Sequence, residues 1–385
     1  KTSMLNRTHL VIYEFAREAS CPPMCSRSEV DVEGKGVSST LDSYCLVSAE
    51  TDLEPLGHSS QVLGCHARSV ADDVASNVTV VITTSPMHSD PDLDMIQTMF
   101  SSLKLAGLEN CRTLLICDRF ELIENAPNER GHLKSGSLKS GVSGRLRPYR
   151  SQESLDRYRA RLDRIRKSDW ATSIEVHELE SWHGYALAIK HALELVSTPL
   201  ACIMQHDLAF LRQIDFQPIV NIFLRGSMGG EPVNMINFPR KHQSNFRSRI
   251  LERWGLDVGP PLAFDGGNQK VLLTRNPCFN DGTHIARVDW YRSIFVKFPS
   301  LTWPGKFIEP KLCPHMLSKA KRASHKVQAE GLQCSSVSRG VQDVCAEFGC
   351  WMFHVDDPQD YIIFHLDGAL QSSRERVDKW HARVA

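Results

Sequence analysis

The residues best suited to chemistry in this chain are a polar triplet, Gln205-His206-Asp207, which directly follows an apolar run. The run, 200–204, has the length of a strand, and unbroken apolar runs are typical of central strands covered on both faces. Open α/β sheets bind their ligands at the carboxyl ends of such strands. The triplet therefore predicts a ligand site at the edge of a sheet.

A helix is predicted just before this strand, over about 186–196. Its apolar residues recur at spacings of three and four, which is the period of a helix with one buried face. The segment Ser197-Thr198-Pro199 ends the helix, because proline lacks an N–H group and disfavours helical geometry in the residue before it. The chain thus runs from a helix through a buried strand to the polar triplet.

This stretch resembles the middle of the GT-A glycosyltransferases, which read approximately N-x-G-x-x-x-A-x-N-x-G, a helix, a hydrophobic strand and D-x-D. Gly184, Ala188 and Lys190 fall near the small and basic positions, and the polar triplet falls on D-x-D. The resemblance is close over roughly thirty residues and loose over about three hundred. It implies an α/β fold with a GT-A (Rossmann-like) mixed sheet flanked by helices. It also implies transfer of a sugar from a nucleotide-diphosphate donor to an acceptor hydroxyl.

The resemblance implies a metal site as well. Asp207 would bind the Mn²⁺ (or Mg²⁺) ion that holds the donor's diphosphate, with Gln205 and Lys190 as further donor-binding residues. Gln205 replaces the first Asp of the motif, which weakens the expected metal binding or requires help from elsewhere. His365 falls where many GT-A enzymes carry a late metal-binding His, and Asp367 is an alternative. Imidazole nitrogen and carboxylate oxygen together suit Mn²⁺ better than Mg²⁺.

Two strongly apolar runs, 78–83 and 113–117, predict the nucleotide-binding half of the sheet, with a helix between them. By the resemblance, Thr83, Thr84 and Ser85 would contact the base or ribose of a UDP- or GDP-sugar. Asp118 would contact the base, or else lie in a surface turn. The chain has no G-x-G-x-x-G and no Walker-type G-K-[ST], which argues against a dinucleotide or an ATP phosphate cradle.

The second half of a GT-A fold supplies the acceptor site and the catalytic base. A base must be a carboxylate or His that can take the proton of the acceptor hydroxyl. Glu309 and Asp281 are the candidates, with helix capping or simple solvation as the alternative for both. Arg240 and Lys241 follow a predicted strand at 233–238 and would assist the departing phosphate.

Composition narrows the class of partner and the compartment. The chain has 385 residues with 45 basic and 45 acidic side chains, so its net charge points neither to nucleic acid nor to an anionic membrane surface. Twelve cysteines suit disulfides and an oxidising compartment, because many of them lie in predicted loops, among them Cys278, Cys313, Cys334, Cys345 and Cys350. Together with what the resemblance implies, this cysteine usage leads us to expect the secretory pathway and the Golgi lumen, with the cytoplasm as alternative. The chain begins at Lys1, so membrane attachment would come only from a missing N-terminal anchor.

The predicted organisation is an N-terminal extension or stem over 1–75 and a GT-A-like domain over 76–385. The segment 125–150 is rich in Gly, Ser and basic residues and is predicted to be a mobile loop. The partners would be a nucleotide-sugar and a glycan or protein acceptor. Two alternatives stay open. One is a nucleotidyltransferase, although the glycine-rich basic loop of that class is absent from 84–90. The other is a catalytically silent GT-A-like binding module, which Gln205 favours.

Overall fold

The computed structural model describes residues 70–85, 93–119, 152–225, 231–243, 245–267, 269–329, 337–357, 360–366 and 373–384, all within one compact unit, 65–385. Residues 1–69 of the predicted stem, the loop 125–150 and Asp367 lie outside the described residues. Helix α1 (Val70–Asn77) crosses the predicted boundary at residue 75 and packs against β1 and α5 of the main domain.

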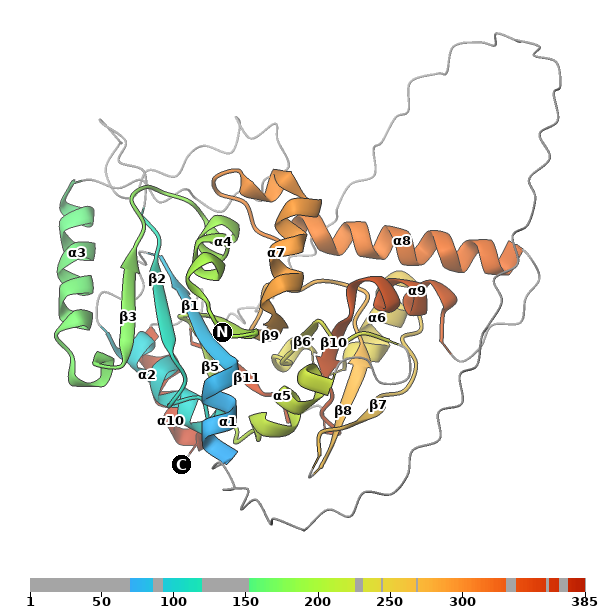
Figure 1. The fold of residues 1–385 in the computed structure, drawn as a ribbon, viewed down its shortest axis with the longest axis horizontal. Helices are drawn as coiled ribbons and strands as arrows, with labels where there is room; N and C mark the ends of the chain where they lie inside the picture. Colours follow the sequence, from blue (N-terminus) through green and yellow to red (C-terminus); the bar gives the residue numbers. More distant parts are fainter. Residues whose placement is uncertain are drawn as a thin grey trace, which may run out of the picture. The chain divides into compact units, whose positions relative to one another are not determined.

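A mixed sheet runs through the middle of the unit, in the order β3-β2-β1-β4-β9-β6-β10-β8-β7 among the described residues (Figure 1). Its strands are β1 (Val78–Thr84), β2 (Thr113–Cys117), β3 (Ile174–Glu178), β4 (Leu200–Gln205), β6 (Met235–Asn237), β7 (Leu262–Asp265), β8 (Lys270–Arg275), β9 (His284–Arg287) and β10 (Cys350–Phe353). The first four strands in this order are parallel, and β9 is antiparallel to both neighbours. Strand β10 pairs parallel with β6, and β8 and β7 follow antiparallel.

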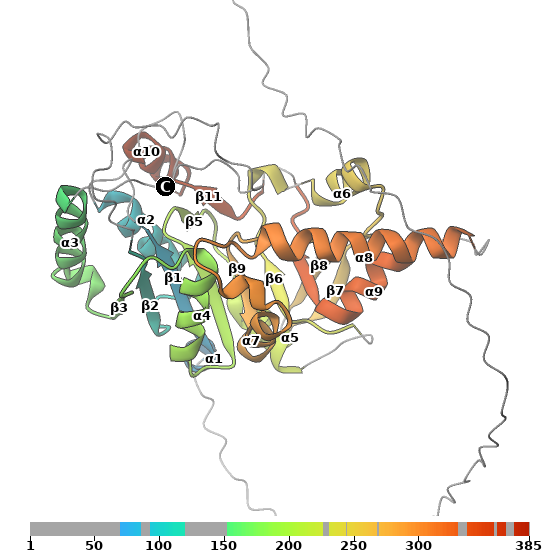
Figure 2. The ribbon, with the colours of Figure 1, turned by 90° about the horizontal axis from the view of Figure 1, so that it is seen from above.

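Helices cover both faces of this sheet, and the view from above looks onto one of these helical layers (Figure 2). One face packs on α1, α2 (Asp94–Ser102), α3 (Gln152–Arg166), α5 (Phe216–Arg225) and α10 (Ser373–Val384). The other face packs on α4 (Tyr185–Leu195), α6 (Phe246–Trp254), α7 (Val288–Lys297), α8 (Glu309–Ala329) and α9 (Arg339–Phe348). The predicted α/β fold, a mixed sheet flanked by helices, is confirmed.

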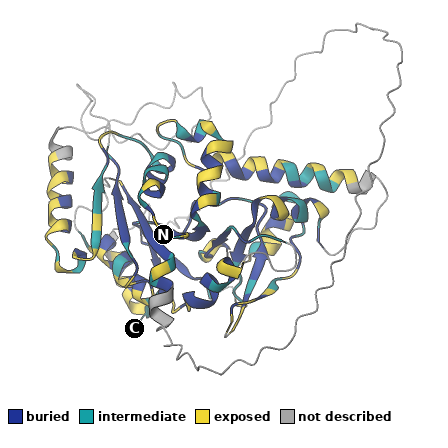
Figure 3. Cartoon of the chain, viewed as in Figure 1, coloured by how far each residue is buried: buried dark blue, intermediate teal, exposed yellow. Residues whose placement is uncertain are grey.

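Two hydrophobic cores result because side chains alternate along each central strand. Val80 and Ile82 of β1 point into the first core, whereas Val81 between them points into the second. The central strands are buried along their length, whereas α3 and α8 carry many exposed residues (Figure 3). No described helix is long and apolar enough to cross a membrane.

A second, two-stranded sheet matters for the site. Strand β5 (Leu208–Phe210) directly follows the polar triplet and pairs antiparallel with β11 (Ile363–His365), with His365 opposite Leu208. The Leu366 N–H donates to the Asp207 carbonyl at 2.7 Å. This pairing brings the end of the chain back to the carboxyl end of β4.

Candidate functional site

The loops that bear the candidate residues gather at one edge of the large sheet. Asp118 follows β2, Thr83 and Thr84 end β1, and Gln205-His206-Asp207 ends and follows β4. Because β9 runs antiparallel, the segment just before it, 280–283, reaches the same edge, as does the segment 238–243 after β6. The ligand site predicted from the triplet therefore faces residues from the second half of the chain.

Asp207 and His365 lie together at this edge. The Asp207 Oδ2 atom is 2.9 Å from His365 Nε2. The other oxygen, Oδ1, is buried and has no hydrogen-bond partner among the described residues. Burial opposes ionisation of Asp207, but the hydrogen bond from His365 and the nearby charge of His206 outweigh it, so the pKa of Asp207 is lowered. The pair presents an ionised carboxylate beside an imidazole.

These two side chains fit a divalent cation. A buried carboxylate oxygen without a partner is costly unless a ligand satisfies it. Carboxylate and imidazole ligands suit Mn²⁺, and such ions also take phosphate oxygens and water. No group of three or more His, Cys, Asp or Glu residues that could hold a metal occurs in the described part of the chain, so the protein would supply two ligands at most from these residues.

The other triplet residues and the end of β1 make local contacts. Gln205 donates from Nε2 to the Asp281 carbonyl at 2.9 Å, which ties β4 to the segment before β9. The His206 N–H donates to the Thr83 carbonyl at 3.1 Å. The Thr84 hydroxyl is buried without a partner among the described residues, and Ser85 is exposed. Contact of Thr83, Thr84 and Ser85 with a nucleoside stays a prediction.

Asp118 is not in a surface turn. It is 6% exposed, and its two oxygens accept hydrogen bonds from the backbone N–H groups of His183, at 2.9 Å, and Gly184, at 2.8 Å. Burial raises the pKa of Asp118, although these two hydrogen bonds oppose the rise. Asp118 thus holds the start of α4 against the end of β2, and its contact with a base stays a prediction.

Lys190 has a different place from the one the resemblance implies. It lies on α4, and its Nζ atom is 2.6 Å from Glu194 Oε1, one turn along the helix, in a largely exposed pair. No described contact brings it to the Asp207–His365 pair. A surface i,i+4 pair is the role that its contacts support.

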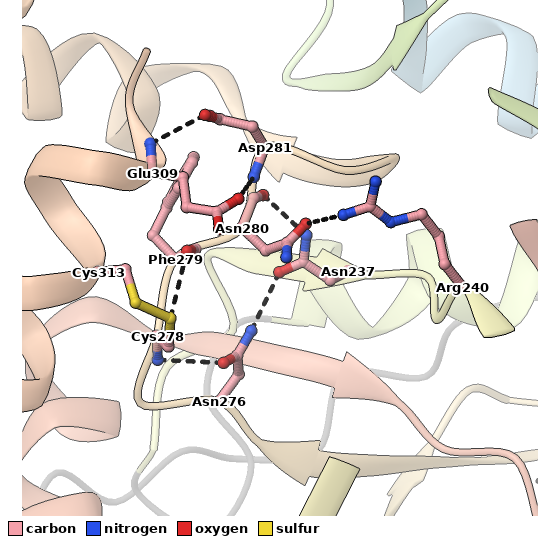
Figure 4. The surroundings of a disulfide bond; sticks show 9 residues. All are labelled: Asn237, Arg240, Asn276, Cys278, Phe279, Asn280, Asp281, Glu309 and Cys313. Atoms are coloured by element: carbon pink, nitrogen blue, oxygen red, sulfur yellow. Dashed lines mark hydrogen bonds between the residues drawn. A yellow bond between two sulfur atoms is a disulfide. The ribbon is translucent and has the colours of Figure 1, made fainter. Parts of the chain in front are cut away.

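Asp281 and Glu309, the alternative bases, lie next to each other (Figure 4). The Asp281 N–H donates to Glu309 Oε2 at 3.1 Å, and the Glu309 N–H donates to Asp281 Oδ2 at 3.0 Å. Because Glu309 begins α8, Asp281 caps that helix. Burial and the nearby charge of Glu309 raise the pKa of Asp281 well above its usual value, although the Glu309 N–H and Arg240 oppose the rise. Glu309 is only half-buried and lines a cavity of about 180 Å³.

A disulfide and three asparagines support this pair from below (Figure 4). Cys278 is bonded to Cys313 of α8, which fixes the segment before β9 to that helix. Asn276 Nδ2 donates to Asn237 Oδ1, and Asn237 Nδ2 donates to the Asn280 carbonyl, both at 3.1 Å. The network holds the loop that ends in Asp281.

The cysteine prediction is only partly confirmed. Cys278 and Cys313 form a disulfide as expected. Cys345 and Cys350, expected to be loop cysteines in disulfides, are instead free and buried in α9 and β10. The sequence prediction failed there because the apolar residues around them belong to an unrecognised helix and strand. Cys334 lies outside the described residues.

Several basic side chains line a cavity next to the Asp207–His365 pair. A cavity of about 970 Å³ is lined by residues of the β6–α6 loop, β11 and α10, among them Arg240, Lys241 and His365. The Arg240 Nε atom is buried without a hydrogen-bond partner among the described residues, and burial lowers the pKa of Arg240. Burial and the charge of Arg240 lower the pKa of His242 to about 4, so this imidazole is neutral near pH 7.

Sequence reasoning missed the three asparagines and the basic residues of α10. Isolated asparagines carry no signal in a single sequence. The α10 residues do carry one, since Arg376, Lys379 and Arg383 recur at the spacing of one helix face.

No protein-family model and no curated protein matches the chain. It is similar to a solved structure of the mannosyltransferase PcManGT from Pyrobaculum calidifontis with GDP-Man and Mn²⁺, with a TM-score of 0.34 and 10% identity over 80% of this chain and 73% of that chain. It is also similar to TarS 1–349 of S. aureus with UDP-GlcNAc, with a TM-score of 0.34 and 8% identity over 77% of this chain and 60% of that chain. A 4-diphosphocytidyl-2C-methyl-D-erythritol synthase from Anaerococcus prevotii DSM 20548 is similar with a TM-score of 0.33 and 6% identity, over 80% of this chain and 98% of that chain. Likeness at this level does not establish a shared activity.

Proposed function

We propose that this chain is a glycosyltransferase that moves a sugar from a nucleotide-diphosphate donor to an acceptor hydroxyl with the help of a divalent cation. The observation that carries the proposal is the meeting of Asp207 and His365, from distant parts of the sequence, at the carboxyl end of the central strand β4. The unpartnered buried oxygen of Asp207 supports a cation there.

The residues around this pair suit a leaving diphosphate. A cation held by Asp207 and His365 would act as a Lewis acid toward the diphosphate oxygens. Arg240 and Lys241 line the same cavity as His365, and their charges would stabilise the negative charge that develops on the leaving group. Arg240 is best placed for this because its buried Nε–H group has no described partner.

Glu309 is the base that the geometry favours, and Asp281 positions it. A general base must reach the hydroxyl of the acceptor, and Glu309 lines a cavity whereas Asp281 is buried. The Asp281 N–H group holds one Glu309 oxygen, and the Asp281 carboxyl caps the helix on which Glu309 stands. In this proposal Glu309 is the base and Asp281 is the residue that positions it.

A catalytically silent binding module is the second candidate. Gln205 favours it, because its side chain nitrogen is engaged by the Asp281 carbonyl and the D-x-D motif lacks its first carboxylate. A silent module would keep the cavities but turn over no donor.

Donor turnover tests the proposal. The full chain is incubated with UDP- and GDP-sugars and Mn²⁺, with water as the hydroxyl that takes the sugar, and the released nucleoside diphosphate is measured. We expect release from one donor, and Glu309→Gln should slow it about 10²- to 10⁴-fold, the usual contribution of a general base. Asp289→Asn, an exposed carboxylate of α7, is the matched control. No release from any donor would support the silent module, and an unchanged rate in Glu309→Gln would remove Glu309 as the base.

A further inference from the structure

The 970 Å³ cavity is far more basic than the chain as a whole. Its lining includes five Arg and Lys side chains, Arg240, Lys241, Arg376, Lys379 and Arg383, and no Asp or Glu side chain among its described lining residues. The whole chain has a formal net charge of zero. Cations gathered around one cavity repel each other unless an anion neutralises them, so this surface is suited to a negatively charged ligand.

Helix α10 is held so that its basic face meets the cavity. Arg376, Lys379 and Arg383 stand at i, i+3 and i+7 and line the cavity together. Val377 and Trp380 point the other way, into the first core, and Trp380 Nε1 donates to a backbone carbonyl of β5 at 2.8 Å. The basic face is therefore a fixed feature of the fold.

The position of the cavity distinguishes it from the expected nucleoside site. The nucleoside candidates lie at the carboxyl ends of β1 (Thr83 and Thr84) and β2 (Asp118). Asp207 follows β4, the next strand in the sheet, and Arg240 follows β6, which lies further along the sheet. None of the nucleoside candidates lines the cavity. A donor with its nucleoside over β1 and β2 and its diphosphate at the metal pair would direct its sugar toward the β6 side. This step rests on the proposed function.

We propose that the cavity binds the phosphate group of a phosphate-ester acceptor. Arg240 and Lys241 serve the leaving diphosphate in the proposed function, which leaves Arg376, Lys379 and Arg383 of α10 for the acceptor. Three cations exceed what a single carboxylate requires, whereas a phosphate ester carries about −1.5 to −2 charges near pH 7. The planar guanidinium group of arginine can also donate two parallel hydrogen bonds to two oxygens of one phosphate. From Arg376, which donates to the His365 carbonyl at 3.1 Å, the basic face extends about 10 Å to Arg383. Its far end therefore lies beyond a diphosphate held at His365.

Charge reversal on α10 tests this site. Lys379 is exposed and makes no hydrogen bond or ion pair with another described residue, so Lys379→Glu and Lys379→Ala should leave the fold intact. Lys270→Glu, an exposed lysine of β8 that lines no described cavity, is the matched control. Calorimetry on the full chain without metal measures the binding of glucose 6-phosphate, of glucuronate as the carboxylate probe, and of phosphatidic acid vesicles.

We expect glucose 6-phosphate to bind without metal, about tenfold or more weakly in Lys379→Glu, and unchanged in Lys270→Glu. Mn²⁺-dependent nucleotide binding should be unchanged in Lys379→Glu. Vesicle binding with the same dependence on Lys379, without binding of glucose 6-phosphate, would assign a lipid-borne phosphate ester. Equal affinity in Lys379→Glu, or glucuronate binding as tightly, would overturn the proposal.

Two further results separate this proposal from the proposed function. Binding of glucose 6-phosphate that requires Mn²⁺ and is lost in Asp207→Asn would show that the cavity serves the donor's diphosphate, and would overturn the acceptor site. Metal-independent binding that depends on Lys379, in a chain that binds no nucleotide, would uphold the anion site but overturn its role as an acceptor site.

Discussion

Replacing Asp118 by Ala should destabilise the fold, because this buried carboxylate satisfies two partly buried backbone N–H groups at the start of α4. The bonds from His183 and Gly184 are 2.9 and 2.8 Å long, and Asp118 is 6% exposed. A buried donor left without an acceptor costs about 1–3 kcal/mol, so two partly buried donors cost at most about 2–6 kcal/mol. Removing a carboxylate whose pKa is raised by burial offsets part of this. We expect a net loss of about 2–4 kcal/mol in the free energy of unfolding.

Urea and thermal denaturation measure this loss, with Asp169→Ala, an exposed carboxylate, as control. For a unit of this size, with an unfolding entropy of about 2.1 cal/mol/K per residue, the loss corresponds to a fall in Tm of about 3–6 °C. If Asp118→Ala unfolds at the same urea concentration as the control, the two hydrogen bonds do not anchor α4. A large loss of nucleotide binding in a variant of unchanged stability would instead assign Asp118 to the base, as the resemblance implies.

Three more predictions concern Asp281, the disulfide and Gly184. Because the folded-state pKa of Asp281 is raised, the folded state holds a proton that the unfolded state loses, and the free energy of unfolding should fall as the pH rises above about 4. In urea denaturation, Asp281→Asn should flatten this dependence on pH. An unchanged dependence would contradict the raised pKa of Asp281. Reducing the Cys278–Cys313 bond, which spans 35 residues, should cost about 3–4 kcal/mol in thermal denaturation, whereas an unchanged Tm in dithiothreitol would refute it. Gly184→Ala should lower the Tm far more than Gly107→Ala: both have positive φ, but only at Gly184 would the new Cβ lie 2.6 Å from a backbone atom. Equal losses would show that the contact relaxes.

The sequence predicted those strands whose residues form a continuous apolar run. Strands β1, β2 and β4 are continuous apolar runs, and their predicted positions agree with the structure within about one residue. Strand β9 was missed, because its four residues include His284 and Arg287 and carry no alternation. It is nevertheless central, since it pairs with β4 on one side and β6 on the other. Its identity as a strand comes from these tertiary pairings.

The candidate site likewise combines a residue that a local pattern predicts with contacts that depend on tertiary packing. Asp207 was found from its place after an apolar strand, whereas His365 came only from the resemblance. Nothing local predicts that β11 pairs with β5, since each has three residues. Asp281 and Glu309 were singled out as alternative bases, and the structure places them in contact. Their reciprocal hydrogen bonds depend on how α8 docks, and a sequence pattern does not encode that docking.

Calorimetric titration of UDP and GDP, with and without Mn²⁺, into the wild-type chain and Asp207→Asn tests the central claim most directly. We predict that one of the two nucleotides binds only when Mn²⁺ is present, and that Asp207→Asn loses this binding while keeping its circular dichroism spectrum. Asp169→Asn, the exposed control, should bind as the wild type does. Metal-dependent binding of equal affinity in Asp207→Asn would contradict a metal site at Asp207 and His365.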